Sequence, residues 1–197
     1  MQRSSFISGV AVVLMLAITV GSVEAGAKPF SAHSVGTCTN KDDFSYTGTP
    51  GHYCTAAGKS TLGLYTAQVV GEAPSDGQTC PLPGGGSGVE FVFVGIDVVL
   101  SFAATKEQLF LHLSPSVTSH ACFDPTTGVE RGQATFNVSG GTGRFAGATG
   151  TTVETFQFIA LAPPISPPGK GFFGSLTSTF DGTIDLPKGE KDGQGGD

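Results

Sequence analysis

The chain lacks tryptophan, has three tyrosines and two methionines, and only 13% of its 197 residues are charged. Ten lysines and arginines against sixteen aspartates and glutamates give a formal net charge of −6. This mild acidity contains no charge runs, so it argues against nucleic acid or an anionic membrane surface as a partner. Nowhere does the sequence offer an amphipathic helix of more than about three turns, which favours an all-β fold.

Long apolar runs are also scarce, and the clearest one, residues 10–20, lies near the N-terminus. Arg3 precedes this run, and Val23-Glu24-Ala25 follows it with the small residues of a cleavage site. The run is shorter than the ~20 residues that span a bilayer. We therefore predict that residues 1–25 are a signal peptide and that the mature chain has no membrane span. The protein is then secreted, to the extracellular space or the periplasm.

The rest of the chain suits a single domain. We expect residues 26–36 to be a linker, residues 37–187 to form a β-barrel domain, and residues 188–197 to be a disordered tail. The tail is expected to be disordered because it is small, polar and rich in glycine.

Four cysteines follow the predicted cleavage site, and an even number in an exported chain indicates two disulfides. Their spacing lacks the short C-x₂₋₄-C pairs of zinc sites. Three pairings are possible. We favour Cys38–Cys54 and Cys80–Cys122, because each bond would tie a loop rich in glycine or proline to its neighbour.

Strands are predicted where β-branched and aromatic residues gather, in residues 60–70, 89–102, 109–113, 133–139, 151–161 and 172–186. Loops rich in glycine and proline fill residues 71–88 and 162–171, a turn is expected at residues 105–108, and His120 and Cys122 fall in a further loop. Six or more strands in sequence favour an antiparallel barrel or sandwich.

Residues 140–150, Gly-Gly-Thr-Gly-Arg-Phe-Ala-Gly-Ala-Thr-Gly, lie between two of these strands. So many glycines predict a sharp bend or a close backbone approach. The segment formally fits the dinucleotide-binding pattern G-x-G-x-x-G/A, which needs a helix after it. Strand-like sequence follows instead, so we interpret the segment as a tight corner in a barrel wall.

The same glycine-rich segment resembles the signature of secreted bacterial proteins of the allene oxide cyclase-like group, related in fold to plant allene oxide cyclases and dirigent proteins. Residues 106–110, Lys-Glu-Gln-Leu-Phe, fit the turn and short strand of that group, with Lys-Glu in place of the usual Gly-Asp. Residues 181–184, Asp-Gly-Thr-Ile, fit its closing strand. The resemblance covers residues 60–184 and implies a single antiparallel eight-stranded barrel, calycin-like, with an apolar lumen. No catalytic residue of the plant enzymes matches a position here, and their trimers and dimers make a homo-oligomer an open expectation.

Three carboxylates interrupt apolar strands and are the candidate catalytic residues: Glu90, Asp97 and Glu154. Period-2 alternation places Asp97 on the same face as Phe91 and Phe93. On a dry lumen face, burial would raise a carboxyl pKa and prepare the group for acid–base work. The alternative is that these groups lie at strand ends or face solvent.

Fifteen phenylalanines dominate the aromatic residues. Four in predicted strands are candidates to line a ligand-binding lumen: Phe91, Phe93, Phe156 and Phe158. The alternative is that the rings fill a solid core. The four histidines have no metal-ligand spacing, and His112, within an apolar strand, is expected to be structural. We expect neither a metal nor another cofactor.

Three functions fit these observations. The favoured one is a non-catalytic exported module or a binder of a small apolar molecule. The second is an isomerase or cyclase that acts in the lumen on an apolar polyunsaturated or polyketide-like substrate without a metal or nucleotide cofactor. The third is an interaction domain that uses the proline-rich residues 163–168.

Overall fold

A computed structural model describes residues 26–41, 51–72, 78–161 and 172–187 of the chain. Eight antiparallel strands form a closed barrel: β1 (Ala27–Lys41), β2 (Gly51–Ser60), β3 (Gly63–Glu72), β6 (Gly95–Phe102), β7 (Gln108–Leu113), β9 (Val129–Gly141), β10 (Thr149–Ala160) and β11 (Phe172–Asp185). Three further strands extend the sheet: β4 (Thr79–Pro81), β5 (Ser87–Val92) and β8 (His120–Asp124).

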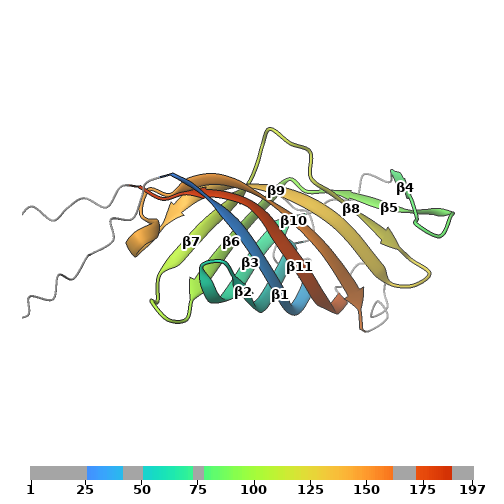
Figure 1. Cartoon of the computed structure of the whole chain (residues 1–197). Helices are drawn as coiled ribbons and strands as arrows, with labels where there is room; N and C mark the ends of the chain where they lie inside the picture. Colours follow the sequence, from blue (N-terminus) through green and yellow to red (C-terminus); the bar gives the residue numbers. More distant parts are fainter. Residues whose placement is uncertain (1–25, 42–50, 73–77, 162–171, 188–197) are drawn as a thin grey trace, which may run out of the picture.

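The barrel closes because β9 is long enough to pair with strands on both sides. Val129 to Asn137 pair with β10, and Phe136 to Gly141 pair with β7. From β10 the ladder continues through β11, β1, β2, β3 and β6 back to β7 (Figure 1). The predicted eight-stranded antiparallel barrel is therefore confirmed.

Side chains alternate between the lumen and the outer surface along each strand. On β6 the inward residues are all buried: Ile96, Val98, Leu100 and Phe102. Phenyl rings from distant parts of the chain fill the half of the lumen next to the glycine-rich corner: Phe30, Phe136, Phe145 and Phe180. This half is packed solid, as the lumen of a small barrel allows.

The glycine corner, residues 140–150, joins β9 to β10 at one end of the barrel (Figure 1). Positive φ angles occur at four of its glycines, which adopt this region freely: Gly140, Gly143, Gly147 and Gly150. A 3₁₀ turn, η2 (Gly143–Phe145), directs Phe145 into the core, where it is fully buried. The Arg144 N–H donates to Glu107 at 2.8 Å, which ties the corner to the turn between β6 and β7. The predicted tight corner is confirmed.

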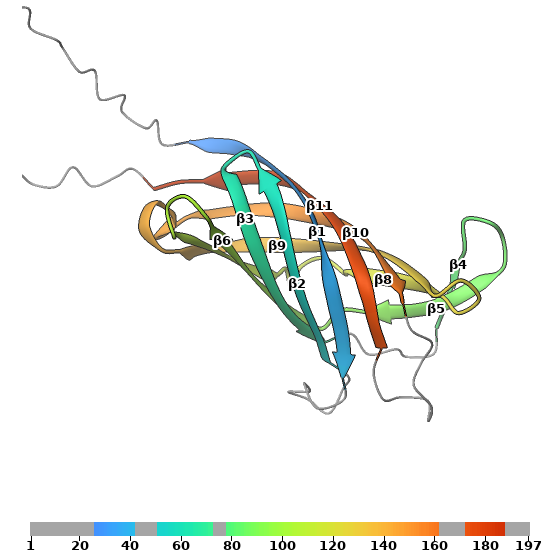
Figure 2. The ribbon, with the colours of Figure 1, turned by 90° about the horizontal axis from the view of Figure 1, so that it is seen from below.

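Strands β4, β5 and β8 form an arm, which projects from the barrel at the end opposite the glycine corner (Figures 1 and 2). The sequence predicted one strand over residues 89–102, but the ladder breaks at Phe93 and Val94. Before the break β5 pairs with β8, and after it β6 pairs with β7. The arm thus leaves the ring where the chain passes from β5 to β6.

Both predicted disulfides are present. Cys38 and Cys54 are directly paired residues of β1 and β2, with Cα atoms 4.0 Å apart. The second bond, Cys80–Cys122, joins β4 to β8 across β5. A Cβ atom at Gly88 of β5 would lie 2.8 Å from the Cys122 sulfur, so glycine leaves room for this bond to cross.

The expected linker over residues 26–36 is wrong, because β1 begins at Ala27 and pairs with β11 from there on. Ala32 and Ser34 face the lumen. Because these inward residues are small, the sequence of β1 lacks the alternation of large apolar and polar residues by which a strand is predicted. Pro29 lies where β1 has β11 as a partner but does not yet pair with β2, so its missing N–H is tolerated. The loop expected around His120 also proves to be a strand, β8.

Within the described residues, no helix has the length and apolar character needed to cross a membrane. The predicted signal peptide (residues 1–25), the proline-rich residues 163–168 and the predicted tail (residues 188–197) lie outside the described residues.

Replacing single glycines of the corner tests its role in closure. A Cβ at Gly150, where φ is 140°, would overlap the Thr183 carbonyl, whereas one at Gly147, where φ is 74°, meets only Pro187 at 4.0 Å. We expect Gly147→Ala to cost about 1 to 2 kcal/mol of unfolding free energy and Gly150→Ala at least about 3 kcal/mol. Urea denaturation measures both, and equal costs would contradict the proposed close approach of β10 to β11.

Candidate functional site

The half of the lumen farther from the glycine corner contains a cavity of about 70 Å³, here called the lumen cavity. A water molecule needs about 10–15 Å³, so the cavity has room for about five water-sized positions. Its walls are mostly apolar: Val69, Phe93, Phe156, Phe158, Leu176 and the Cys38–Cys54 disulfide. Three titratable side chains also line it: His52, Glu130 and Glu154.

Glu154 faces inward on β10, opposite Phe180 of β11 and Ala134 of β9. Its side chain is only 7% exposed. Burial raises the pKa of Glu154 to about 7, and the hydroxyl of Ser178, which hydrogen-bonds the carboxylate, lowers it in part. Near neutral pH this carboxyl therefore exists in both protonation states.

Glu130 faces the same cavity from β9, because the inward alternation of Phe136 and Ala134 continues through Gly132 to position 130. The side chain is 5% exposed, and burial raises its pKa to about 7. In the described part of the chain, neither Glu130 nor Glu154 forms an ion pair with a basic side chain. Two nearly buried acids thus face one mainly apolar space, with no basic partner among the described residues.

His52 of β2 contributes a neutral ring to the cavity wall. Burial lowers its pKa to about 4, so the ring carries no charge at pH 7. Its Nε2 atom is buried and has no hydrogen-bond partner among the described residues. A buried polar atom of this kind costs free energy unless a further molecule satisfies it.

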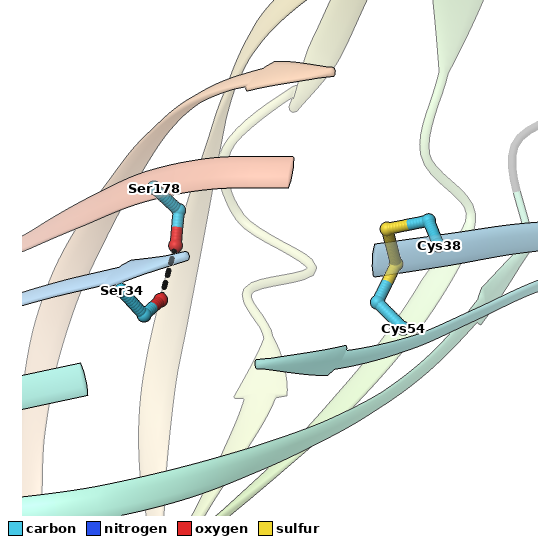
Figure 3. Close-up of a disulfide and its surroundings, with 4 residues drawn as sticks. All are labelled: Ser34, Cys38, Cys54 and Ser178. Carbon is cyan, nitrogen blue, oxygen red and sulfur yellow. Dashed lines mark hydrogen bonds between the residues drawn. A yellow bond between two sulfur atoms is a disulfide. The ribbon is translucent and has the colours of Figure 1, made fainter. Parts of the chain in front are cut away.

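On β1 and β11, two hydroxyl groups lie between the packed half of the barrel and the lumen cavity. Ser34 of β1 and Ser178 of β11 hydrogen-bond at 2.9 Å, beside the Cys38–Cys54 disulfide (Figure 3). Ser178 interacts in turn with Glu154, and Tyr65 of β3 approaches Ser34. Burial raises the pKa of Tyr65, whose hydroxyl makes no hydrogen bond of standard geometry in the described part.

Phe93 and Phe156 meet on the arm side of the cavity, with ring centroids 5.9 Å apart. Phe93 lies at the break between β5 and β6. The ring of Phe156 covers Gly132, where a Cβ would overlap it. The two rings join the barrel wall to the point where the arm departs.

The three candidate carboxylates have different positions. Asp97 lies on the outer face, 73% exposed, where it binds His112 at 2.7 Å. Glu90 lies on the arm, beside His120 and Arg131 in a wide polar groove. Only Glu154 lies in the lumen. Asp97 lies on the outer face because the break after β5 interrupts the alternation of side chains. The sequence prediction had continued that alternation through the break and so placed Asp97 on the same face as Phe93.

Three of the four candidate phenylalanines line the lumen cavity: Phe93, Phe156 and Phe158. Phe91 is in β5 of the arm, opposite Ala121 of β8, and does not line the lumen cavity. The sequence interpretation missed Glu130 and His52. Extending the strand at residues 133–139 backward by its own alternation would have found Glu130, while His52 lies on β2, which was not predicted.

Among the described residues, no group of three or more His, Cys, Asp or Glu side chains is arranged to hold a metal ion. Comparisons with protein-family models, curated proteins and solved structures find no match to this chain. The chemistry of the lumen cavity is therefore the basis for assigning a function.

The raised pKa values predict how stability depends on pH. A carboxyl whose pKa rises from 4.5 to about 7 on folding contributes stability below pH 4.5 that is lost as the pH rises through 7. This difference is worth about 3 kcal/mol per group. His52, with a lowered pKa, has the opposite effect and costs stability as the pH falls from 6.5 toward 4.

We therefore expect wild-type stability to rise as the pH falls from 8.5 to 6.5. Glu130→Gln and Glu154→Gln should each raise the unfolding free energy at pH 8.5 by about 2 to 3 kcal/mol and flatten the pH dependence. Urea denaturation across this range measures the effect, with Glu90→Gln on the arm as the matched control. A double variant with the wild-type pH slope would show that these carboxyls are already ionised in the folded protein.

Proposed function

We propose that this protein is an exported barrel that binds a small, mainly apolar molecule with one polar end in the lumen cavity. The observation that carries the proposal is the convergence of Glu130 and Glu154, both nearly buried, on one apolar cavity. Groups with pKa values shifted by burial, gathered in a hollow, are typical of functional sites. A purely structural lumen would be stabilised by apolar residues at these two positions.

The rest of the wall supports a ligand with an apolar body. Val69, Leu176 and the ring of Phe158 offer no hydrogen-bonding groups, so this part of the ligand gains mainly from leaving water. The cavity volume of about 70 Å³ sets the size. It is well below the ~300–1,000 Å³ of pockets for drug-sized molecules, so we expect a small ligand or a small end group.

The location and the family are part of the same proposal. Two disulfides are compatible with an oxidising compartment, which agrees with export by the predicted signal peptide.

We also propose membership in the allene oxide cyclase-like barrels, supported by the eight-stranded ring and by the place of the glycine corner between β9 and β10. A homo-oligomer, implied by the plant relatives, stays a prediction.

Native mass spectrometry of the protein purified from its own host tests binding. We expect a bound small molecule that is released on denaturation. Val69→Phe places a ring in the cavity and should remove the adduct, whereas Leu64→Phe, on the 63% exposed outer side of the same strand, should retain it. Absence of any adduct from the wild type, or equal adducts in the two variants, would contradict binding in the lumen.

A second candidate function, an isomerase or cyclase, is favoured by one observation on Glu154. Its pKa of about 7 and its contact with Ser178 suit a general acid or base at neutral pH. Cofactor-free proton transfer within the lumen needs no more than such a group and a bound substrate.

Incubation of the recovered ligand with the protein, followed by chiral chromatography, tests this second function. We expect Glu154→Gln to bind the ligand but to convert it at least about 100-fold more slowly, as for loss of a general acid–base group. Glu90→Gln should convert it at the wild-type rate. Recovery of unchanged ligand from the wild-type protein would leave binding as the function and reject catalysis.

A further inference from the structure

We propose, on the basis of the binding function above, that the polar end of the ligand is a primary ammonium group, so that the lumen cavity is a site for a small hydrophobic amine. Three features of the cavity wall carry this inference: its acceptors, its two acids without a basic side chain among the described lining residues, and its aromatic rings.

The polar groups of the wall are suited to accept hydrogen bonds. Ionised Glu130 and Glu154 accept and do not donate, and the neutral ring of His52 accepts at Nε2 when its proton is on Nδ1. A primary ammonium carries three N–H donors. It can therefore donate to a carboxylate of the wall, and the wall offers no polar group that such a ligand would leave facing a second donor.

The charge of the cavity wall also favours an ammonium ligand. Arg131 follows Glu130 in the sequence but is exposed on the outer face of β9, and Arg144 pairs with Glu107 at the glycine corner. In the described part, no basic side chain lines the cavity beside its two acids. An anion would meet like charge there, whereas a cation supplies a counter-ion and makes a charge-assisted hydrogen bond to a carboxylate.

The aromatic part of the wall fits an alkylammonium as well. Phe156 and Phe158 are the next inward residues after Glu154 on β10, Phe158 is paired with Glu130 of β9, and Phe93 contacts Phe156. Phenyl rings stabilise an adjacent cation through their negative faces and also pack against alkyl groups. A strongly hydrated inorganic cation gains less from such a wall than an alkylammonium does.

The titratable groups around the acids give binding a definite pH trend. His52 from β2 and Tyr65 from β3 are the other such groups that face them in the described part, and both are neutral near pH 7. Ionisation of Glu130 and Glu154 therefore controls the charge of the cavity. An ammonium should therefore bind more tightly at pH 8 than at pH 6. A neutral ligand that accepts hydrogen bonds from the protonated carboxyls should show the opposite trend and bind more weakly at pH 8 than at pH 6.

NMR titrations of the purified protein with three probes of similar size test the ammonium assignment: isobutylamine, isobutanol and isobutyrate. An alkylamine stays protonated at pH 8, as lysine does with its pKa of about 10.4. We expect isobutylamine to bind at least about 10-fold more tightly than isobutanol at pH 8, and at least about 5-fold more tightly at pH 8 than at pH 6. The ratio of about 10-fold matches the smaller losses seen when one charged hydrogen bond is removed. The pH ratio follows from the ionised fraction of a carboxyl with a pKa of about 7, which rises roughly tenfold from pH 6 to pH 8. Isobutyrate should not bind.

Variants assign the effect to the two acids. Glu130→Gln/Glu154→Gln should abolish the preference for isobutylamine over isobutanol, and Glu90→Gln should retain it. The amides remove a charge that burial disfavours, so the variant is expected to fold. If it does not, loss of the wild-type preference between pH 8 and pH 5 provides the same evidence.

Two results would overturn the ammonium assignment without touching the binding function: equal binding of isobutanol and isobutylamine at pH 8, or tighter binding of isobutyrate. If no probe binds and the protein from its host also carries no adduct, the binding function and the ammonium assignment both fail. Tight isobutylamine binding that persists in the double variant would place the amine elsewhere and also overturn the assignment.

Discussion

The double pairing of β9 is the interaction on which the rest of this structure depends. With β10 on one side and β7 on the other, β9 turns an open sheet into a ring, and only a ring encloses a lumen. The glycine corner makes the pairing with β10 possible, because its backbone reverses within a few residues and directs Phe145 into the core. Closure is also what removes Glu154 and Glu130 from water. Their raised pKa values follow from the topology.

The two halves of the lumen differ in the side chains that face it. Next to the corner, phenyl rings leave no space, and this half stabilises the fold. Farther along, beyond the hydroxyl pair Ser34 and Ser178, the apolar filling stops and two acids face a small cavity. This arrangement destabilises the empty protein at neutral pH, since each ionised carboxyl is held away from water. Such a local departure from good packing is the common mark of a site for another molecule.

Sequence patterns predicted those parts of the fold that depend on local signals. Alternating apolar residues marked β7 and most of β9 to β11, glycine frequency marked the corner, and cysteine number and spacing marked the disulfides. Inward positions occupied by small or polar residues, such as Ser34 and His52, escaped notice, because they become lumen positions only when the ring closes. The break at Phe93 was equally hidden: it depends on which strands β5 and β6 pair with, and residue order alone does not contain that information. Only Glu154 of the three candidate acids therefore proved to lie in the lumen.

The pairing of β1 with β11 has a consequence for the order of folding. Phe30 lies opposite Gly182, so the two strands that complete this side of the ring come from the two ends of the barrel sequence. Early strands can form hairpins, such as β2 with β3, while later ones are still being made, but the interior stays open to water until β11 arrives. Contacts between such distant residues require closing a very long loop, which slows folding to about milliseconds to seconds in all-β proteins. The barrel therefore closes only after its last strand, β11, has been made.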